Sequence, residues 1–230
     1  GKNKKGARTI QIGTEKALYS MITSRFMPDY PTKDTRTDFV NTGYKVDTVT
    51  VVGWIKDMPE QYKKEKTFKF SSTNLFTDKQ ESVYADLDEQ GRFTAKIPVL
   101  NSSEFTIDWS RCFIRTMFEP GKTYFLLYDF KEGRRYFMDD DCRLQNELLR
   151  YPLDWKSVRL EKRVDNFDPY MASADSLIKA QYASIDELCQ VHPTLSTRFN
   201  KFKKGHTLMM QAGYFGQARF EAPDRKLPEN

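Results

Sequence analysis

A series of short alternating runs between residues 45 and 138 constrains the fold of this chain most. In Arg92–Val99, RFTAKIPV, polar and apolar residues alternate one by one, which is typical of a β-strand with one face in a core. Residues 46–55, VDTVTVVGWI, are rich in the β-branched side chains that favour strands. Further runs occupy residues 67–76, 82–87, 105–109, Cys112–Phe118, 123–130 and 135–138. These seven or eight short strands with frequent turns predict an antiparallel β-sandwich.

The letters GKT at residues 121–123 are also the last letters of a phosphate-binding P-loop. That motif needs an earlier glycine, where this chain has Thr116, and a following helix, where it has the aromatic run YFLLYDF. A turn explains the same letters better, because proline presets φ at the second turn position and glycine tolerates positive φ at the third. The sequence therefore predicts a tight turn between neighbouring antiparallel strands, made of Glu119, Pro120, Gly121 and Lys122.

The run at residues 123–130 is apolar on both faces. Tyr124 and Leu126 lie on one face of such a strand, and Phe125 and Leu127 on the other. A strand of this kind is usually covered from both sides. We expect the helices or the N-terminal lead-in to cover its outer face.

The residue pattern becomes typical of helices after residue 138. Three aspartates at residues 139–141 precede CRLQNELLRY, and the sequence predicts a helix there that is capped by Asp140 and Asp141; a calcium loop is the alternative interpretation of these acids. Residues 169–191 have apolar side chains at steps of three and four, which predicts a long amphipathic helix. A further helical segment starts near Leu195, with a break expected at Gly205.

The whole chain is therefore expected to be α+β, with strands first and helices second. Its predicted parts are a lead-in at residues 1–44 with a short helix near 16–26, a β-sandwich at 45–138, a helical subdomain at 139–222, and a linker-like end at 223–230.

Composition and motifs give no catalytic, cofactor-binding or metal-binding residue. The chain has 230 residues and a net charge of +5, without the basic stripe that nucleic-acid binding needs and without an apolar run long enough for a transmembrane segment. The three cysteines form no C-x-x-C, and the two histidines lie in no zinc motif. Cys189 and His192 are close in sequence, but we interpret Cys189 as a buried thiol. The three tryptophans, Trp54, Trp109 and Trp155, are either core residues or a sugar-binding platform.

Two stretches, FEPGKTYFLLYDF at residues 118–130 and FMDDDCRLQNELLRYPLDW at 137–155, resemble the N-terminal region of envelope thioredoxin-like thiol–disulfide oxidoreductases of Gram-negative gut bacteria. The stretches DELCQVHPTLSTR and MMQAGYFGQARF are similar to the helical segment of that region. The resemblance spans residues 45–227 and implies a β-rich domain, a short helix, and a thioredoxin domain downstream. This chain departs from the family because it has no C-x-x-C, so no redox residue can be carried over.

We therefore expect a non-catalytic accessory module that positions a partner domain or presents a binding surface. Its partner would be a downstream thioredoxin domain or another envelope protein, and the parent protein would be the thiol–disulfide oxidoreductase. The resemblance implies a place in the periplasm or cell envelope, with a lipid anchor before processing. The alternative is a stand-alone module that binds peptide or glycan at the cell envelope. A hydrolase with unrecognised carboxylates is a third hypothesis.

Overall fold

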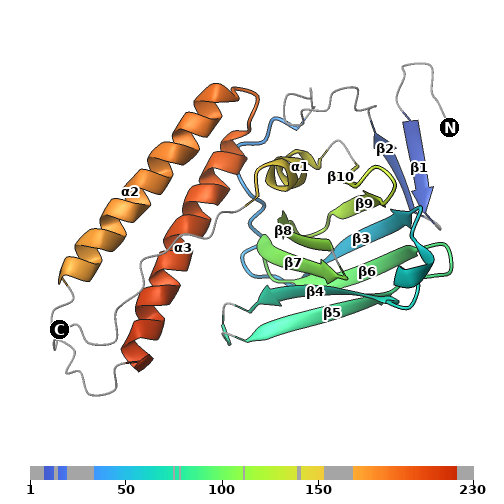
Figure 1. The fold of residues 1–230 in the computed structure, drawn as a ribbon, viewed down its shortest axis with the longest axis horizontal. Coiled ribbons are helices and arrows are strands. Elements are labelled where there is room, and N and C mark those ends of the chain that lie inside the picture. The colour runs from blue at the N-terminus through green and yellow to red at the C-terminus, as the bar shows by residue number, and fades with distance from the viewer. Residues whose placement is uncertain are drawn as a thin grey trace. The chain divides into compact units, whose positions relative to one another are not determined.

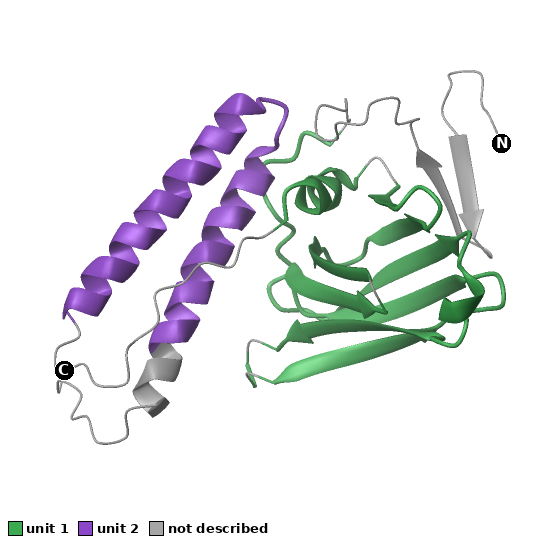
Figure 2. Cartoon of the chain, in the orientation of Figure 1, with its two compact units in different colours: residues 1–152 green, residues 153–230 purple. Residues whose placement is uncertain are grey.

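The computed structural model describes residues 8–12, 15–19, 34–74, 76–77, 79–110, 112–138, 141–152 and 168–221. The chain divides into two compact units, residues 1–152 and residues 153–230 (Figure 2). The fold is α+β: eight strands form two open four-stranded sheets, and the described residues also contain three α-helices (Figure 1).

Each of the two sheets takes strands from distant parts of the sequence. Sheet I has the order β10–β9–β3–β6, and sheet II has the order β5–β4–β7–β8. The strands of sheet I are β3 (Asp47–Lys56), β6 (Arg92–Val99), β9 (Thr123–Asp129) and β10 (Arg134–Phe137). Those of sheet II are β4 (Thr67–Thr73), β5 (Gln80–Asp86), β7 (Ser103–Trp109) and β8 (Cys112–Phe118). All eight lie where the alternating runs predict strands.

One strand pair departs from the antiparallel expectation. β3 and β9 run parallel, in a register that joins Thr50 with Thr123 and Lys56 with Asp129, whereas the other pairs of both sheets are antiparallel. The reason is that the chain leaves β8 in sheet II and enters β9 in sheet I. A parallel pair needs such a long crossover between its two strands, and local sequence patterns do not reveal it.

The two sheets share one hydrophobic core. Phe68 of sheet II stacks on Phe93 of sheet I with ring centroids 4.4 Å apart, and on Trp109 at 5.3 Å. Gly53 on β3 makes room for this stack, because a Cβ at that position would lie 2.0 Å from the ring of Phe93. Each buried side chain of this size contributes roughly 1.5–3 kcal/mol before conformational entropy is counted.

Both faces of β9 are buried, as its sequence predicts. Tyr124 and Leu126 belong to the core shared by the two sheets, whereas Phe125 packs with Val52 and Met138 in a second, smaller cluster. The exposed fractions of Phe125 and Val52 are only 1% and 0%.

The short helix α1 (Arg143–Arg150) makes hydrogen bonds with one edge strand of each sheet, β8 and β10. The side chain of Gln145 donates a hydrogen bond of 2.7 Å to the carbonyl of Met117 on edge strand β8. Asn146 accepts from the backbone of Phe137 on edge strand β10 at 2.9 Å and donates back to it at 2.7 Å. Satisfied edge groups cannot pair with another chain. These bonds also place α1 in the first compact unit, which extends to residue 152, beyond the boundary expected at residue 138.

The helix cap expected at Asp141 is not observed. The N-cap of α1 is Cys142, whose side chain makes no capping hydrogen bond. The carboxylate of Asp141 instead accepts a hydrogen bond of 2.6 Å from Lys122, whose full positive charge attracts it more strongly than a partial helix charge does. Asp140 lies outside the described residues.

The expected helix near residues 16–26 is also wrong in its first part. Lys16–Tyr19 belong to β2 (Glu15–Tyr19), which pairs antiparallel with β1 (Arg8–Ile12); the rest of that range lies outside the described residues.

The second compact unit contains two long helices, α2 (Asp168–Val191) and α3 (Thr197–Glu221). Lys204 of α3 donates a hydrogen bond of 2.6 Å to Asp186 of α2, and Gln211 donates one of 2.9 Å to the hydroxyl of Tyr170. The break expected at Gly205 is wrong, because α3 continues through it. Glycine lowers helix propensity by only about 1 kcal/mol, and packing against α2 outweighs that. No described helix combines the length and the hydrophobicity of a membrane span.

Candidate functional site

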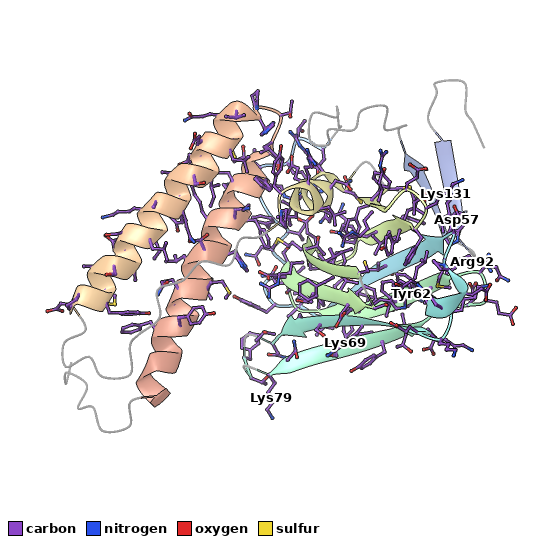
Figure 3. The ribbon with its side chains drawn as sticks, in the orientation of Figure 1. Asp57, Tyr62, Lys69, Lys79, Arg92 and Lys131 are labelled. Atoms are coloured by element: carbon purple, nitrogen blue, oxygen red, sulfur yellow. The ribbon has the colours of Figure 1, made fainter. Side chains whose placement is uncertain are left out.

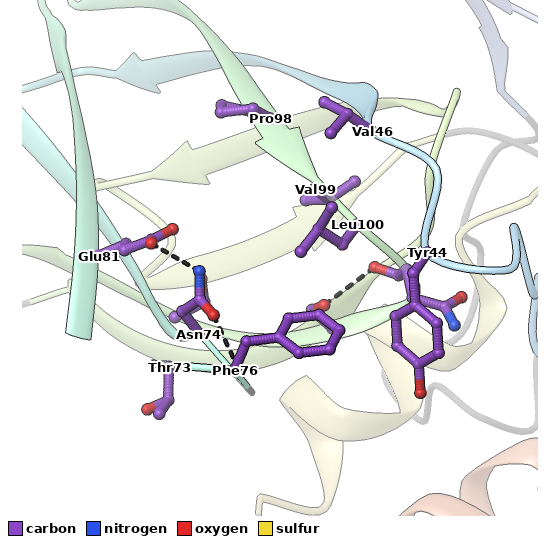
Figure 4. A pocket seen from close by; sticks show the side chains of 12 residues that line it. Tyr44, Val46, Thr73, Asn74, Phe76, Glu81, Pro98, Val99 and Leu100 are labelled. Atoms are coloured by element: carbon purple, nitrogen blue, oxygen red, sulfur yellow. Dashed lines mark hydrogen bonds between the residues drawn. The ribbon is translucent and has the colours of Figure 1, made fainter. Parts of the chain in front are cut away.

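A pocket of about 160 Å³ opens among the ends of strands from both sheets (Figure 4). It forms because β4 and β7 pair only through Lys69–Ser71 of β4, so that Ser72 and Ser103 beyond the last pair line the opening. One side of it is apolar and comes from Val46, which is 72% exposed, and from the end of β6. The apolar residues on this side are Val46, Pro98, Val99 and Leu100.

Two aromatic side chains stand at the rim of this pocket. Tyr44 and Phe76 are 54% and 67% exposed, and their ring centroids lie 5.4 Å apart in an edge-to-face arrangement. Large aromatic side chains usually bury most of their surface in a core. Exposed side chains elsewhere on the first unit include charged ones such as those of Lys79, Arg92 and Lys131 (Figure 3).

The backbone at Tyr44 adopts a conformation that non-glycine residues seldom use. Gly43 and Tyr44 have φ values of 60° and 63°, the combination found at the centre of a type I′ turn. The turn is closed by a hydrogen bond of 3.4 Å from the amide of Lys45 to the carbonyl of Thr42. A left-handed non-glycine residue costs about 1–3 kcal/mol, and such strain concentrates at functional sites.

The segment that carries Tyr44 is fastened to the loop after β6. Thr42 donates its hydroxyl to the carbonyl of Leu100 at 2.6 Å, and Ser102 donates its hydroxyl to the carbonyl of Val40 at 2.6 Å. Tyr44 is therefore held beside the pocket by bonds that do not involve its own side chain.

Phe76 is positioned by an Asx turn. The side-chain oxygen of Asn74 accepts the backbone amides of Phe76 at 2.9 Å and Thr77 at 3.2 Å. The amide nitrogen of Asn74 donates to a carboxylate oxygen of Glu81 at 2.7 Å. This pair fixes the loop between β4 and β5 and places a carboxylate and an amide together at the polar side of the pocket.

A buried ionic network anchors the other end of the Tyr44 segment. The carboxylate of Glu119 is fully buried; it accepts Arg36 at 2.9 Å and the backbone amide of Val40 at 3.1 Å. Arg36 also donates one hydrogen bond to each carboxylate oxygen of Asp34, both at 2.8 Å. The hydrogen bonds with Asp34 and the charge of Glu119 raise the pKa of Arg36 above its already high ordinary value, so the guanidinium stays charged.

The residues of the predicted turn, Glu119 to Lys122, supply this anchor. Gly121 has a φ of 72°, and the amide of Lys122 lies 3.4 Å from the carbonyl of Glu119. The strands that flank this turn do not pair with each other, so the expected hairpin is wrong: the turn carries the chain from sheet II to sheet I. The hydroxyl of Tyr124 accepts the amide of Glu119 at 3.1 Å, and burial raises the pKa of Tyr124.

Neither Trp54 nor Trp109, which the sequence singled out, lines the pocket. Trp109 is buried in the shared core, Trp54 is half-buried and donates its indole N–H to the carbonyl of Gln90 at 3.1 Å, and Trp155 lies outside the described residues. Cys189 is half-buried, and its sulfur lies 3.6 Å from the side-chain amide of Asn200.

The described residues contain no metal-binding group and no disulfide. No group of three or more His, Cys, Asp or Glu side chains there is arranged to hold a metal ion. Cys112 and Cys142 are free and buried, and burial raises the pKa of Cys112 to about 11.

The sequence analysis did not identify the two rim residues, Tyr44 and Phe76, or the two residues on the polar side of the pocket, Asn74 and Glu81. The available signals were the Thr-Gly pair before Tyr44, which favours a tight turn, and the seven-residue spacing of Asn74 and Glu81 around a hairpin loop. No protein-family model, curated protein or solved structure matches the chain.

Proposed function

We propose that the first compact unit is a non-catalytic binding module. The observation that carries this proposal is the left-handed backbone of Tyr44, which holds an exposed aromatic ring next to Phe76 over a preformed pocket. Binding pockets combine apolar and aromatic walls with a few fixed polar groups, and this pocket has that composition.

We further propose that the two sheets act as the layers of a β-sandwich and that a helical subdomain follows it. The shared core of sheets I and II supports the first part. A site fixed on such a scaffold loses little conformational entropy when a ligand binds. The hydrogen bonds of α1 with β8 and β10 support a role for the pocket, and not for these strand edges, in recognition.

In this proposal the module is an accessory part of a thioredoxin-like envelope protein in the periplasm or cell envelope. Its task is to bind a target or to position the downstream thioredoxin domain. The resemblance of residues 118–130 and 137–155 to that family supports this context. The alternative, a stand-alone peptide- or glycan-binding module, uses the same pocket, and the gene sequence beyond residue 230 separates the two.

The test is a binding screen of the whole chain against short peptides and soluble oligosaccharides, read by two-dimensional NMR. Ligands should shift the backbone resonances of Tyr44 and Phe76 first, and Tyr44→Ala and Phe76→Ala should each weaken binding. Tyr84→Ala is the matched control, because Tyr84 is 62% exposed on β5 and does not line the pocket. Ligands that bind the two rim variants as tightly as the natural chain would refute the assignment of the site.

A further inference from the structure

We propose that the pocket recognises a neutral saccharide, with one sugar ring stacked on the Tyr44–Phe76 rim. This inference rests on the proposed function and deepens it by naming the class of ligand. Three features of the described residues carry it: the charge of the lining, the pattern of free hydrogen-bonding groups, and the aromatic rim.

The charge of the lining disfavours anionic ligands. Among the described residues that line the pocket, Glu81 is the only one whose side chain is charged at neutral pH, and none is a lysine, arginine or histidine. Phosphates, carboxylates and acidic sugars would meet a like charge there without a compensating cation. A ligand without net negative charge fits this lining.

The polar side of the pocket offers an acceptor and a donor next to each other. The oxygen of Asn74 is occupied by two backbone amides, and one amide hydrogen of Asn74 is used by the first carboxylate oxygen of Glu81. The second amide hydrogen of Asn74 and the second oxygen of Glu81 make no hydrogen bond within the described part of the chain. Neighbouring sugar hydroxyls, each both donor and acceptor, match such a pair.

The aromatic rim complements the apolar faces of a sugar ring. A pyranose presents C–H groups on its faces and hydroxyls at its edge, so an exposed aromatic ring takes the face while the amide and carboxylate take the edge. Tyr44 adds a phenolic hydroxyl that has no hydrogen-bond partner among the described residues. Figure 4 shows Glu81, Asn74 and Phe76 next to one another, with Tyr44 beyond the ring of Phe76.

The experiment is isothermal titration calorimetry of the whole chain with neutral hexasaccharides of glucose, mannose and xylose. The comparison ligands are a hexamer of galacturonic acid and an uncharged hexapeptide. We expect at least one neutral hexasaccharide to bind and the acidic hexamer not to bind. Tyr44→Ala and Phe76→Ala should each weaken binding by about tenfold or more, and Glu81→Gln should weaken it several-fold.

Two controls keep the outcome clear. Tyr84→Ala and Phe113→Ala remove exposed aromatic rings outside the pocket and should bind like the natural chain, and the melting temperature of every variant establishes that it is folded. Binding of the peptide alone, weakened by the rim variants, would overturn the saccharide and leave the binding module standing. Absence of any binding that depends on the rim would overturn both.

Discussion

Glu119→Gln tests the buried network that anchors the Tyr44 segment. The substitution keeps the shape of the side chain and an acceptor for the amide of Val40, but it removes the negative charge that faces Arg36 at 2.9 Å. Breaking a buried ion pair costs about 3–5 kcal/mol. We reduce this to about 1–3 kcal/mol because the Arg36 side chain is 29% exposed and retains Asp34 as a partner.

The assay is urea unfolding of the whole chain, followed by tryptophan fluorescence and by amide hydrogen exchange. Exchange at Val40 should become faster in Glu119→Gln, because the anchor of its segment is weakened. A double-mutant cycle with Arg36→Met isolates the pair and should give a coupling of about 1 kcal/mol or more. Glu60→Gln is the control: its ion pair with Lys63 is exposed, and its loss should cost no more than about 0.5 kcal/mol.

The reasoning fails if Glu119→Gln unfolds within about 0.5 kcal/mol of the natural chain. It also fails if the cycle gives no coupling between the two positions. Either result would mean that the Glu119–Arg36 pair does not anchor the segment, and that its hydrogen bonds to the loop after β6, such as those of Thr42 and Ser102, are sufficient.

Three further predictions concern single residues of the first unit and one thiol of the second. Gly121→Val should destabilise the first unit by about 1–3 kcal/mol in urea unfolding, because its φ of 72° strains a β-branched residue; an unchanged midpoint would contradict this. The side chain of Lys56 donates a hydrogen bond to Asp129 and lowers the pKa of that carboxyl. The contribution of this pair to the free energy of unfolding is therefore full above about pH 4, and it is lost as the pH falls through the lowered pKa. The stability difference between the natural chain and Asp129→Asn should therefore shrink below about pH 4; a constant difference down to pH 2.5 would refute it. Burial raises the pKa of Cys112 to about 11, so iodoacetamide at pH 8 should modify Cys189 first, as mass spectrometry can establish, and insulin reduction should be undetectable.

The strands could be predicted from the sequence because their signal is local. Arg92–Val99 begins and ends where the alternation does, since each alternating position selects a buried or an exposed face. Cys112–Phe118 also has the predicted bounds, although its last three residues are all buried. The partners of each strand are not local. The parallel pairing of β3 with β9 depends on β8 joining the other sheet, and no residue within the 119–122 turn encodes that choice.

One helical expectation, the cap at Asp141, failed for a different physical reason, whereas the helix predicted at residues 169–191 is observed as α2. Asp141 has the chemistry of a cap, but its carboxylate pairs with Lys122 at 2.6 Å and lies 4.0 Å from Arg36. These competing partners lie 19 and 105 residues away from Asp141 in sequence. A helix-capping rule that considers only neighbouring residues cannot take them into account. The candidate site was missed in the same way, because segments that are apart in sequence meet only at the ends of the two sheets.

The magnitudes at Tyr44 favour a ligand over packing as the reason for its side chain. An edge-to-face pair such as Tyr44–Phe76 contributes about 0.5–1.5 kcal/mol, and less when both rings are more than half exposed. The left-handed backbone at Tyr44 costs about 1–3 kcal/mol. A glycine at position 44, like the one at position 43, would avoid that cost. The aromatic pair therefore does not offset the strain by itself. In the proposed binding mode, a stacked sugar ring adds contact area on the same two rings and offsets part of that strain in the bound state.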